Sequence, residues 1–258
     1  MKKFALVCAI ALLSTTWTFA QSSKATAAIN TAVGCTLSTA SSPADATLPQ
    51  NCHDIFSGAA TEVTADNFAT IMSATIKVSN SQSLFVSPSL VAGLYTNTKV
   101  KTSTGSTSSA VAAGGVYLRA IVTNAATGQT TIGYPVAVCN TDILGCHADA
   151  NGNFGVTLDS RIQTLTQSIS DCIVTITGGG SGTCTFDLTT DLILQTTSAH
   201  TFNFIFPNVG VGNYTIKIQA AVNSDAQVSG SGSAAGAAAY GLGSLTVESV
   251  RLVHDFSF

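Results

Sequence analysis

Three polar residues, Asp149, Asn151 and Asn153, alternate along the segment HADANGNFGVTLD at residues 147–159. Their spacing is that of the first three oxygen ligands of a Ca²⁺-binding loop, and Asp159 lies beside the twelfth position, where such a loop supplies a bidentate carboxylate. The sixth position is Phe154 instead of glycine, so half of the motif is present. Because Asp, Asn and Gly also form tight turns, a turn without any cofactor is the favoured interpretation, and a calcium site is the alternative.

Paired carboxylates could indicate glycoside hydrolysis, in which one acts as an acid and the other as a base or nucleophile. The available carboxylates are two glutamates, Glu62 and Glu248, and eleven aspartates, most of which lie in turn-like sequence. Glu248 is the best single candidate, because it lies where we expect a β-bulge, a feature that redirects side chains near active sites. The sequence contains no Gly-x-Ser-x-Gly, His-Glu-x-x-His or glycine-rich phosphate loop. We therefore assign no catalytic residue, and a hydrolase is kept as an alternative.

Six cysteines follow the first 20 residues, and an even number in an exported chain indicates disulfide bonds. They are Cys35, Cys52, Cys139, Cys146, Cys172 and Cys184. Neighbours in sequence are the natural partners, although fifteen connectivities are open. A hairpin with Thr177 opposite Thr183 would set Cys172 and Cys184 four residues out of step, about 13 Å, where a disulfide tolerates about 7 Å. Either that register or that pair is therefore wrong.

Residues 1–20 have the pattern of a secretory signal peptide. Two lysines precede an apolar run from Phe4 to Leu13, and small residues lead to a cleavage site after Ala20. The run is about half as long as the ~20 residues that a membrane-spanning helix needs. We expect an exported chain without a membrane span, located outside the cell or in the periplasm.

The composition describes an uncharged, hydroxyl-rich surface. Charged residues make up 9 % of the chain, and its formal net charge is −3. We do not expect nucleic-acid binding, because it requires a basic surface. A glycan or another protein is the expected partner, and the oligomeric state is left open. Few Lys, Glu and Arg residues combined with many β-branched residues favour strands over long helices.

Alternation of apolar and polar residues predicts strands at several places. The patterns include IMSATIKV, VYLRAIV and two arms around a Pro-Asn-Val-Gly turn, FNFIF and YTIKI, which we expect to pair as a hairpin. Pro88 is expected to divide SLFVSPSLVAGLY into two short strands or to make it an edge strand with a break. The segment KATAAINTAV could form a short helix, and SGSGSAAGAAAYGLG at residues 229–243 is expected to be a flexible, exposed loop.

These patterns together predict a disulfide-stabilised all-β protein, an antiparallel β-sandwich of the jelly-roll kind. The expected organisation is a signal peptide over residues 1–20, an irregular segment over residues 21–65 and one β-sandwich domain over residues 66–258. Most of the core should come from the alternating apolar residues of the predicted strands.

Three segments, SQSLFVSPSLVAGLYTNTKV, GGVYLRAIV and HTFNFIFPNVGVGNYTIKIQ, carry a resemblance. They are similar to segments of uncharacterised exported β-sandwich proteins of environmental bacteria, over residues 66–255. The third also looks like the late strands of jelly-roll domains that bind receptors or sugars. The resemblance implies a β-sandwich and transfers no binding residue, since fold does not imply function.

The favoured function is an exported, non-catalytic surface or extracellular module that binds a glycan or a protein, or that serves as a structural surface subunit. A secreted carbohydrate-active hydrolase is the alternative. An outer-membrane β-barrel, suggested by the terminal Phe258, is the least favoured because His254 would lie on its lipid-facing side.

Overall fold

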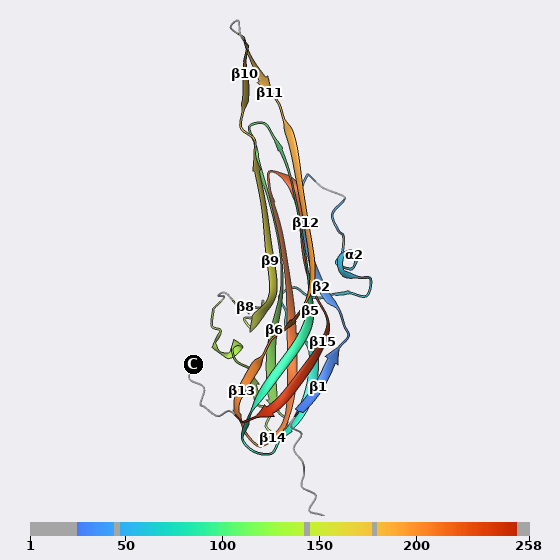
Figure 1. Ribbon diagram of the computed structural model, residues 1–258, viewed down its shortest axis with the longest axis vertical. Coiled ribbons are helices and arrows are strands. Elements are labelled where there is room, and N and C mark those ends of the chain that lie inside the picture. Colours follow the sequence, from blue (N-terminus) through green and yellow to red (C-terminus); the bar gives the residue numbers. More distant parts are fainter. Residues whose placement is uncertain (1–24, 44–46, 142–144, 177–179, 252–258) are drawn as a thin grey trace, which may run out of the picture.

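The structure is a computed structural model that describes residues 25–43, 47–141, 145–176 and 180–251. The predicted signal peptide and the residues His254 to Phe258 lie outside these ranges. Within them, long strands form two sheets that pack face to face along an elongated molecule (Figure 1). The predicted all-β sandwich is confirmed.

The first sheet has seven strands and the second has six. The first sheet has the order β12 (Asp187–Thr201), β5 (Gln82–Ser103), β15 (Ser231–Val250), β2 (Gly34–Ser42) and β3 (Thr61–Glu62), with β1 (Ala25–Asn30) paired to β15 and β13 (Phe204–Val209) paired to β5. The second has the order β4 (Ala69–Val78), β14 (Gly212–Ser229), β6 (Thr107–Asn124), β9 (Phe154–Ser168) and β8 (Cys146–Ala148), with β7 (Thr130–Ile132) paired to β6.

Three small elements complete the fold. A hairpin of β10 (Cys172–Ile176) and β11 (Gly180–Cys184) extends beyond the two sheets between β9 and β12 (Figure 1). One helical turn, α2 (His53–Phe56), lies on the outer side of the first sheet, and a 3-10 turn, η1 (Val136–Val138), follows β7. In the part of the chain that the structure describes, no helix is long and apolar enough to cross a membrane.

The core lies between the sheets and is built from the alternating apolar residues that the sequence identifies. Met72, Ala74, Ile76 and Val78 of β4 are buried, as are Val116, Leu118, Ala120 and Val122 of β6. The predicted inward faces of these two strands are therefore confirmed. Each buried Leu, Ile or Phe side chain contributes about 2–3 kcal/mol by leaving water.

The predicted hairpin at residues 202–218 is wrong in its pairing. Its first arm, β13, pairs with β5 in the first sheet, whereas its second arm, β14, pairs with β4 and β6 in the second sheet. The chain therefore crosses from one sheet to the other at the turn. Phe204 and Phe206 face Ile216 and Ile218 across the core, and all four side chains are buried. The two apolar stripes meet as opposing layers, which alternation alone cannot distinguish from a hairpin.

The Ala- and Gly-rich segment at residues 229–243 is a central strand and not the predicted loop. It forms the first half of β15, between β5 and β2, and Ala234 to Tyr240 are buried on both faces. A β-carbon placed on Gly236 would lie 2.2 Å from the Ala113 carbonyl oxygen of the opposite sheet, and one on Gly114 would lie 2.6 Å from the Ala237 oxygen. The small residues let the two backbones touch.

Three other local predictions are also wrong. The segment expected to be helical forms β1, which pairs with β15. The expected bulge at Glu248 is absent from the register of β15, whose shift lies between Tyr240 and Gly243. Pro88 does not break β5, because its neighbours on one edge are the end of β12 and the start of β13, and its missing N–H falls in the gap between these two strands.

Disulfides connect Cys35 to Cys52 and Cys139 to Cys146, the sequence neighbours. In the hairpin of β10 and β11, Cys172 lies directly opposite Cys184, and Cys184 is disulfide-bonded. The predicted register with Thr177 opposite Thr183 is therefore wrong, because Thr183 pairs with Ile173. Residues directly opposite in an antiparallel pair have their Cα atoms about 4.5–5.5 Å apart, within the range of a disulfide.

Candidate functional site

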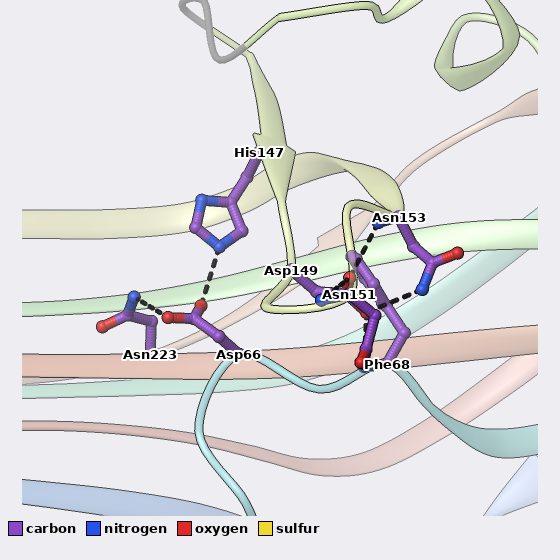
Figure 2. Close-up of polar contacts among 7 residues, drawn as sticks. All are labelled: Asp66, Phe68, His147, Asp149, Asn151, Asn153 and Asn223. Carbon is purple, nitrogen blue, oxygen red and sulfur yellow. Dashed lines mark hydrogen bonds and ion pairs between the residues drawn. The ribbon is translucent and has the colours of Figure 1, made fainter.

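Asp66 is the centre of a polar cluster on the outer face of the second sheet (Figure 2). Its Oδ1 lies 2.8 Å from Nε2 of His147, and its Oδ2 accepts a hydrogen bond of 2.6 Å from the side-chain amide of Asn223. The Asp66 backbone is held as well, because its N–H donates to Val222 O and its carbonyl accepts from the Ala150 N–H. Asp66 thus connects the loop before β4 with β8 and β14 through its carboxylate, and with the turn after β8 through its backbone carbonyl.

His147 is fixed on two sides. It follows Cys146, whose disulfide to Cys139 ties down the start of β8. Its ring stacks on the ring of Tyr117 from β6, with centroids 3.6 Å apart and planes 12° from parallel. The contacts of the imidazole are therefore a carboxylate at one nitrogen and the face of an aromatic ring, and neither provides an activated nucleophile.

The predicted Ca²⁺ residues Asp149, Asn151 and Asn153 form the turn between β8 and β9. Oδ1 of Asp149 accepts hydrogen bonds from the N–H groups of Asn151 and Asn153, at 2.9 and 2.7 Å. Its Oδ2 accepts from the Asn153 side-chain amide at 3.1 Å and from the Phe68 N–H at 3.4 Å. Asp149 is 5 % exposed. Its carboxylate thus serves as the acceptor that organises the turn (Figure 2).

Two opposite charges are buried beside this turn. Burial is the largest influence on the pKa of Asp149 and acts to raise it, but the hydrogen bonds from Asn153, Asn151 and Phe68 together outweigh burial and lower that pKa. Arg119 lies 4.8 Å above the Phe68 ring and donates from Nε to Gln219. Burial lowers the pKa of Arg119, and the charge of Asp149 opposes this effect.

Asp159, the fourth residue predicted to bind Ca²⁺, is not brought to the turn. An extra residue in β9 shifts its register against β6 between Thr157 and Asp159. Asp159 then faces the other sheet, where its Oδ2 lies 3.2 Å from Ser198 Oγ and 3.3 Å from His200 Nε2. Among the described residues, no three His, Cys, Asp or Glu side chains are arranged to hold a metal ion.

The arrangement of Asp149 leads to a prediction about calcium. We expect the melting temperature of the mature protein to be the same in millimolar Ca²⁺ and in EDTA, because four N–H groups already use the oxygens that a cation would need. Differential scanning fluorimetry measures this directly. A melting temperature that rises with Ca²⁺, and does not rise in Asn151→Ala, would instead assign the turn as a cation site, since a ligand of the native state stabilises it by mass action.

A second polar cluster, of Asp159, Ser198 and His200, joins the edges of the two sheets. Ser198 and His200 are two residues apart on β12 and therefore share a face. Ser198 Oγ is 2.7 Å from His200 Nε2 and donates to Asp159 Oδ2. The same edge contains a hydrogen bond from Arg161 to Thr196.

The geometry of this second cluster does not match that of a catalytic triad. In a Ser-His-Asp triad the serine and the aspartate use opposite nitrogens of the imidazole, so that a proton can pass from serine to histidine while the aspartate stabilises the imidazolium. Here Ser198 and Asp159 both contact Nε2 of His200, and Ser198 Oγ is also within hydrogen-bond distance of the Asp159 carboxylate. The three groups form a closed ring that connects β9 to β12.

The two glutamates also lack the geometry for glycoside hydrolysis. Glu62 accepts a hydrogen bond from the Cys52 N–H and pairs in register with Cys35, which pairs with Ala239 of β15. Glu248 lies nine positions further along β15 and is exposed. At ~3.3 Å per residue the two carboxylates are more than about 20 Å apart, whereas hydrolysis needs about 5–9.5 Å.

Sequence reasoning missed both polar clusters. Asp66 and His147 are 81 residues apart, and no local pattern connects them. The contact between Ser198 and His200 could have been predicted from their spacing, since residues two apart on a strand lie on the same face. No protein-family model matches the chain, and no curated protein matches its sequence.

Proposed function

We propose that this protein is an exported, non-catalytic module that binds a protein partner through the free edge of β12. The predicted signal peptide and the disulfides support a location outside the cell or in the periplasm, where oxidising conditions maintain such bonds. The two polar clusters have structural contacts in place of catalytic geometry, and the two glutamates are too far apart for glycoside hydrolysis. Binding is therefore the activity that the arrangement of residues supports best.

The free edge of β12 is the observation that carries this proposal. β12 has 15 residues and pairs with β5 on one side, and its other side has no strand partner among the described residues. Leu188, Leu192, Ile193 and Leu194 are 51, 41, 55 and 42 % exposed. Natural edge strands are usually protected by charged side chains, proline, a bulge or short length. β12 is long, has no proline and no shift of register against β5, and its acidic residues are Asp187 and Asp191. Such an edge suits the addition of an extended strand from a partner.

A glycan is the second candidate ligand, because a shallow apolar groove of about 190 Å³ lies on the outer face of the first sheet. Phe56 from α2 lines it together with Val91 of β5 and Leu242 of β15. Aromatic rings beside apolar surface are typical of sugar-binding sites. This groove lies beside Thr197 of β12, so the two candidate surfaces are adjacent but separable by mutation.

The test compares an array of 15-residue peptides from exported proteins with a glycan array, both probed with the mature protein. The edge variant carries Leu192→Lys and Leu194→Lys, and a matched control carries Asn213→Lys and Gln227→Lys, two exposed positions on β14. Peptide binding that the edge variant loses and the control keeps supports the proposal. Glycan binding that only Phe56→Ala removes, or turnover of a polysaccharide, would overturn it.

A further inference from the structure

The exposed part of β12 has a sequence that reads nearly the same in both directions. Residues 189–197 are TTDLILQTT, with Ile193 at the centre. The symmetry is broken at one pair, Asp191 and Gln195, where the acid on one side corresponds to an amide on the other. Eight of these nine residues are exposed, and Thr190 is partly exposed.

We propose that a second copy of this chain pairs antiparallel with β12, about a two-fold axis at Ile193, so that the first sheets of two molecules become one continuous sheet. This inference rests on the proposed function, because it identifies the partner that adds to the free edge. In this register every pair but one joins residues of the same kind: Ile193 with Ile193, Leu192 with Leu194, Thr190 with Thr196 and Thr189 with Thr197.

The facing side chains are complementary across this pair. Threonine pairs directly opposite one another stabilise antiparallel sheets, whereas opposed like charges destabilise them. Leucine pairs add the burial of apolar surface. Asp191 lies opposite Gln195 of the second copy, so a carboxylate meets an N–H donor twice. The Gln195 amide has two N–H groups, and one of them donates to Ile55 O. Within its own sheet, Asp191 lies opposite Lys99 of β5.

Other registers lose this complementarity. Moving the axis by one residue, to Leu194, would place Leu192 opposite Thr196 and Ile193 opposite Gln195. Parallel pairing in register would place Asp191 opposite Asp191 of the second copy, which is destabilising. The antiparallel pair at Ile193 leaves no like charges opposed along residues 189–197, and it covers the apolar residues at the middle of the edge.

The first experiment uses single cysteines introduced into the mature protein. In the proposed dimer two Ile193 residues face each other with their Cα atoms about 4.5–5.5 Å apart, which permits a disulfide. Two Thr189 residues would be eight positions out of step, about 26 Å apart. We therefore expect Ile193→Cys to form a covalent dimer under mild oxidation and Thr189→Cys to remain monomeric. Equal cross-linking of both variants would overturn the register.

The second experiment exchanges the one asymmetric pair and follows dimerisation by sedimentation at increasing protein concentration. Gln195→Asp places two carboxylates opposite each other twice, so we expect the dissociation constant to rise at least tenfold. Adding Asp191→Gln to this variant restores the complementary pair and should return the dissociation constant to within about threefold of its original value. Wild-type protein that stays monomeric up to millimolar concentration would overturn the dimer, while peptide binding at the same edge would leave the proposed function in place.

Discussion

Replacing Gly236 with alanine is expected to lower the free energy of unfolding by about 3 kcal/mol, at the upper end for an overpacked core. The added methyl group would lie 2.2 Å from the Ala113 oxygen and 2.4 Å from the Asp225 oxygen. Both obstacles are backbone atoms of the second sheet, which cannot move aside by changing rotamer. The two sheets must separate at this level, and their close contact over the small residues of β15 is lost. Urea unfolding followed by circular dichroism measures the change.

Gly241→Ala is the matched control for this prediction. Gly241 lies in the same strand, and the nearest atom to an added β-carbon there would be Val91 Cβ at 3.8 Å, an ordinary contact. We expect the free energy of unfolding to change by less than about 1 kcal/mol in this variant. If both variants lost the same free energy of unfolding, the close approach of the sheets at Gly236 would not contribute to stability.

Replacing Asp149 with alanine is expected to lower the free energy of unfolding by about 3 kcal/mol, since each buried donor left without an acceptor costs about 1–3 kcal/mol. The variant leaves the N–H groups of Asn151, Asn153 and Phe68 without their acceptor and removes the negative charge near buried Arg119. Chemical denaturation gives the value. Asp225→Ala, which removes an exposed aspartate of β14, should change stability by less than about 0.5 kcal/mol.

The contribution of Asp149 should depend on pH in one direction. Its pKa is lower in the folded protein than the ordinary value near 3.9 in an unfolded chain, so the unfolded state binds more protons between these two values. The stabilisation is complete above about pH 4 and is lost as the pH falls through the lowered pKa. The stability difference between wild type and Asp149→Asn should therefore shrink as the pH is lowered from 5 to 2. A difference that stays constant over this range would contradict the assignment.

Strand faces in this protein could be predicted from the sequence, but strand partners could not. The alternation in β4 and β6 identifies which side chains point to the core, because a strand has a period of two. The same alternation in β13 and β14 predicts two inward faces and is equally compatible with a hairpin or with a crossing between sheets. Partner choice depends on contacts with β5 and β6, more than 80 residues away.

Composition misled the prediction for β15. Serine, glycine and alanine are typical of flexible segments, and the run from Ser229 to Gly243 contains few large apolar residues that would indicate a core. This run is buried because the backbones of the two sheets come close together there. Such an approach requires residues with small side chains, and small side chains contribute little to the hydropathy from which burial is predicted. The turn of β10 and β11 was misplaced for a related reason, because several adjacent glycines permit more than one register.

The candidate site was predictable where it is local. The turn at Asp149 is visible in the sequence because its acceptor and three of its four donor groups lie within five residues. The pairing of His147 with Asp66 and the meeting of Asp159 with His200 depend on how two sheets come together. The free edge of β12 is a property of topology, whereas the symmetry of its residues about Ile193 is a property of the sequence alone.

The position of β15 in the first sheet has a consequence for how the molecule is assembled in time. This strand supplies the hydrogen-bonding partner of β1 and β2, which precede it by about 200 residues. In a chain that emerges from a ribosome or a translocation channel in sequence order, β1 has no strand partner and β2 has only its two-residue pairing with β3 until β15 arrives. Contacts so distant in sequence slow folding, and unpaired strand edges invite aggregation in the meantime. The early strands are therefore open to pairing with other chains for as long as β15 is missing.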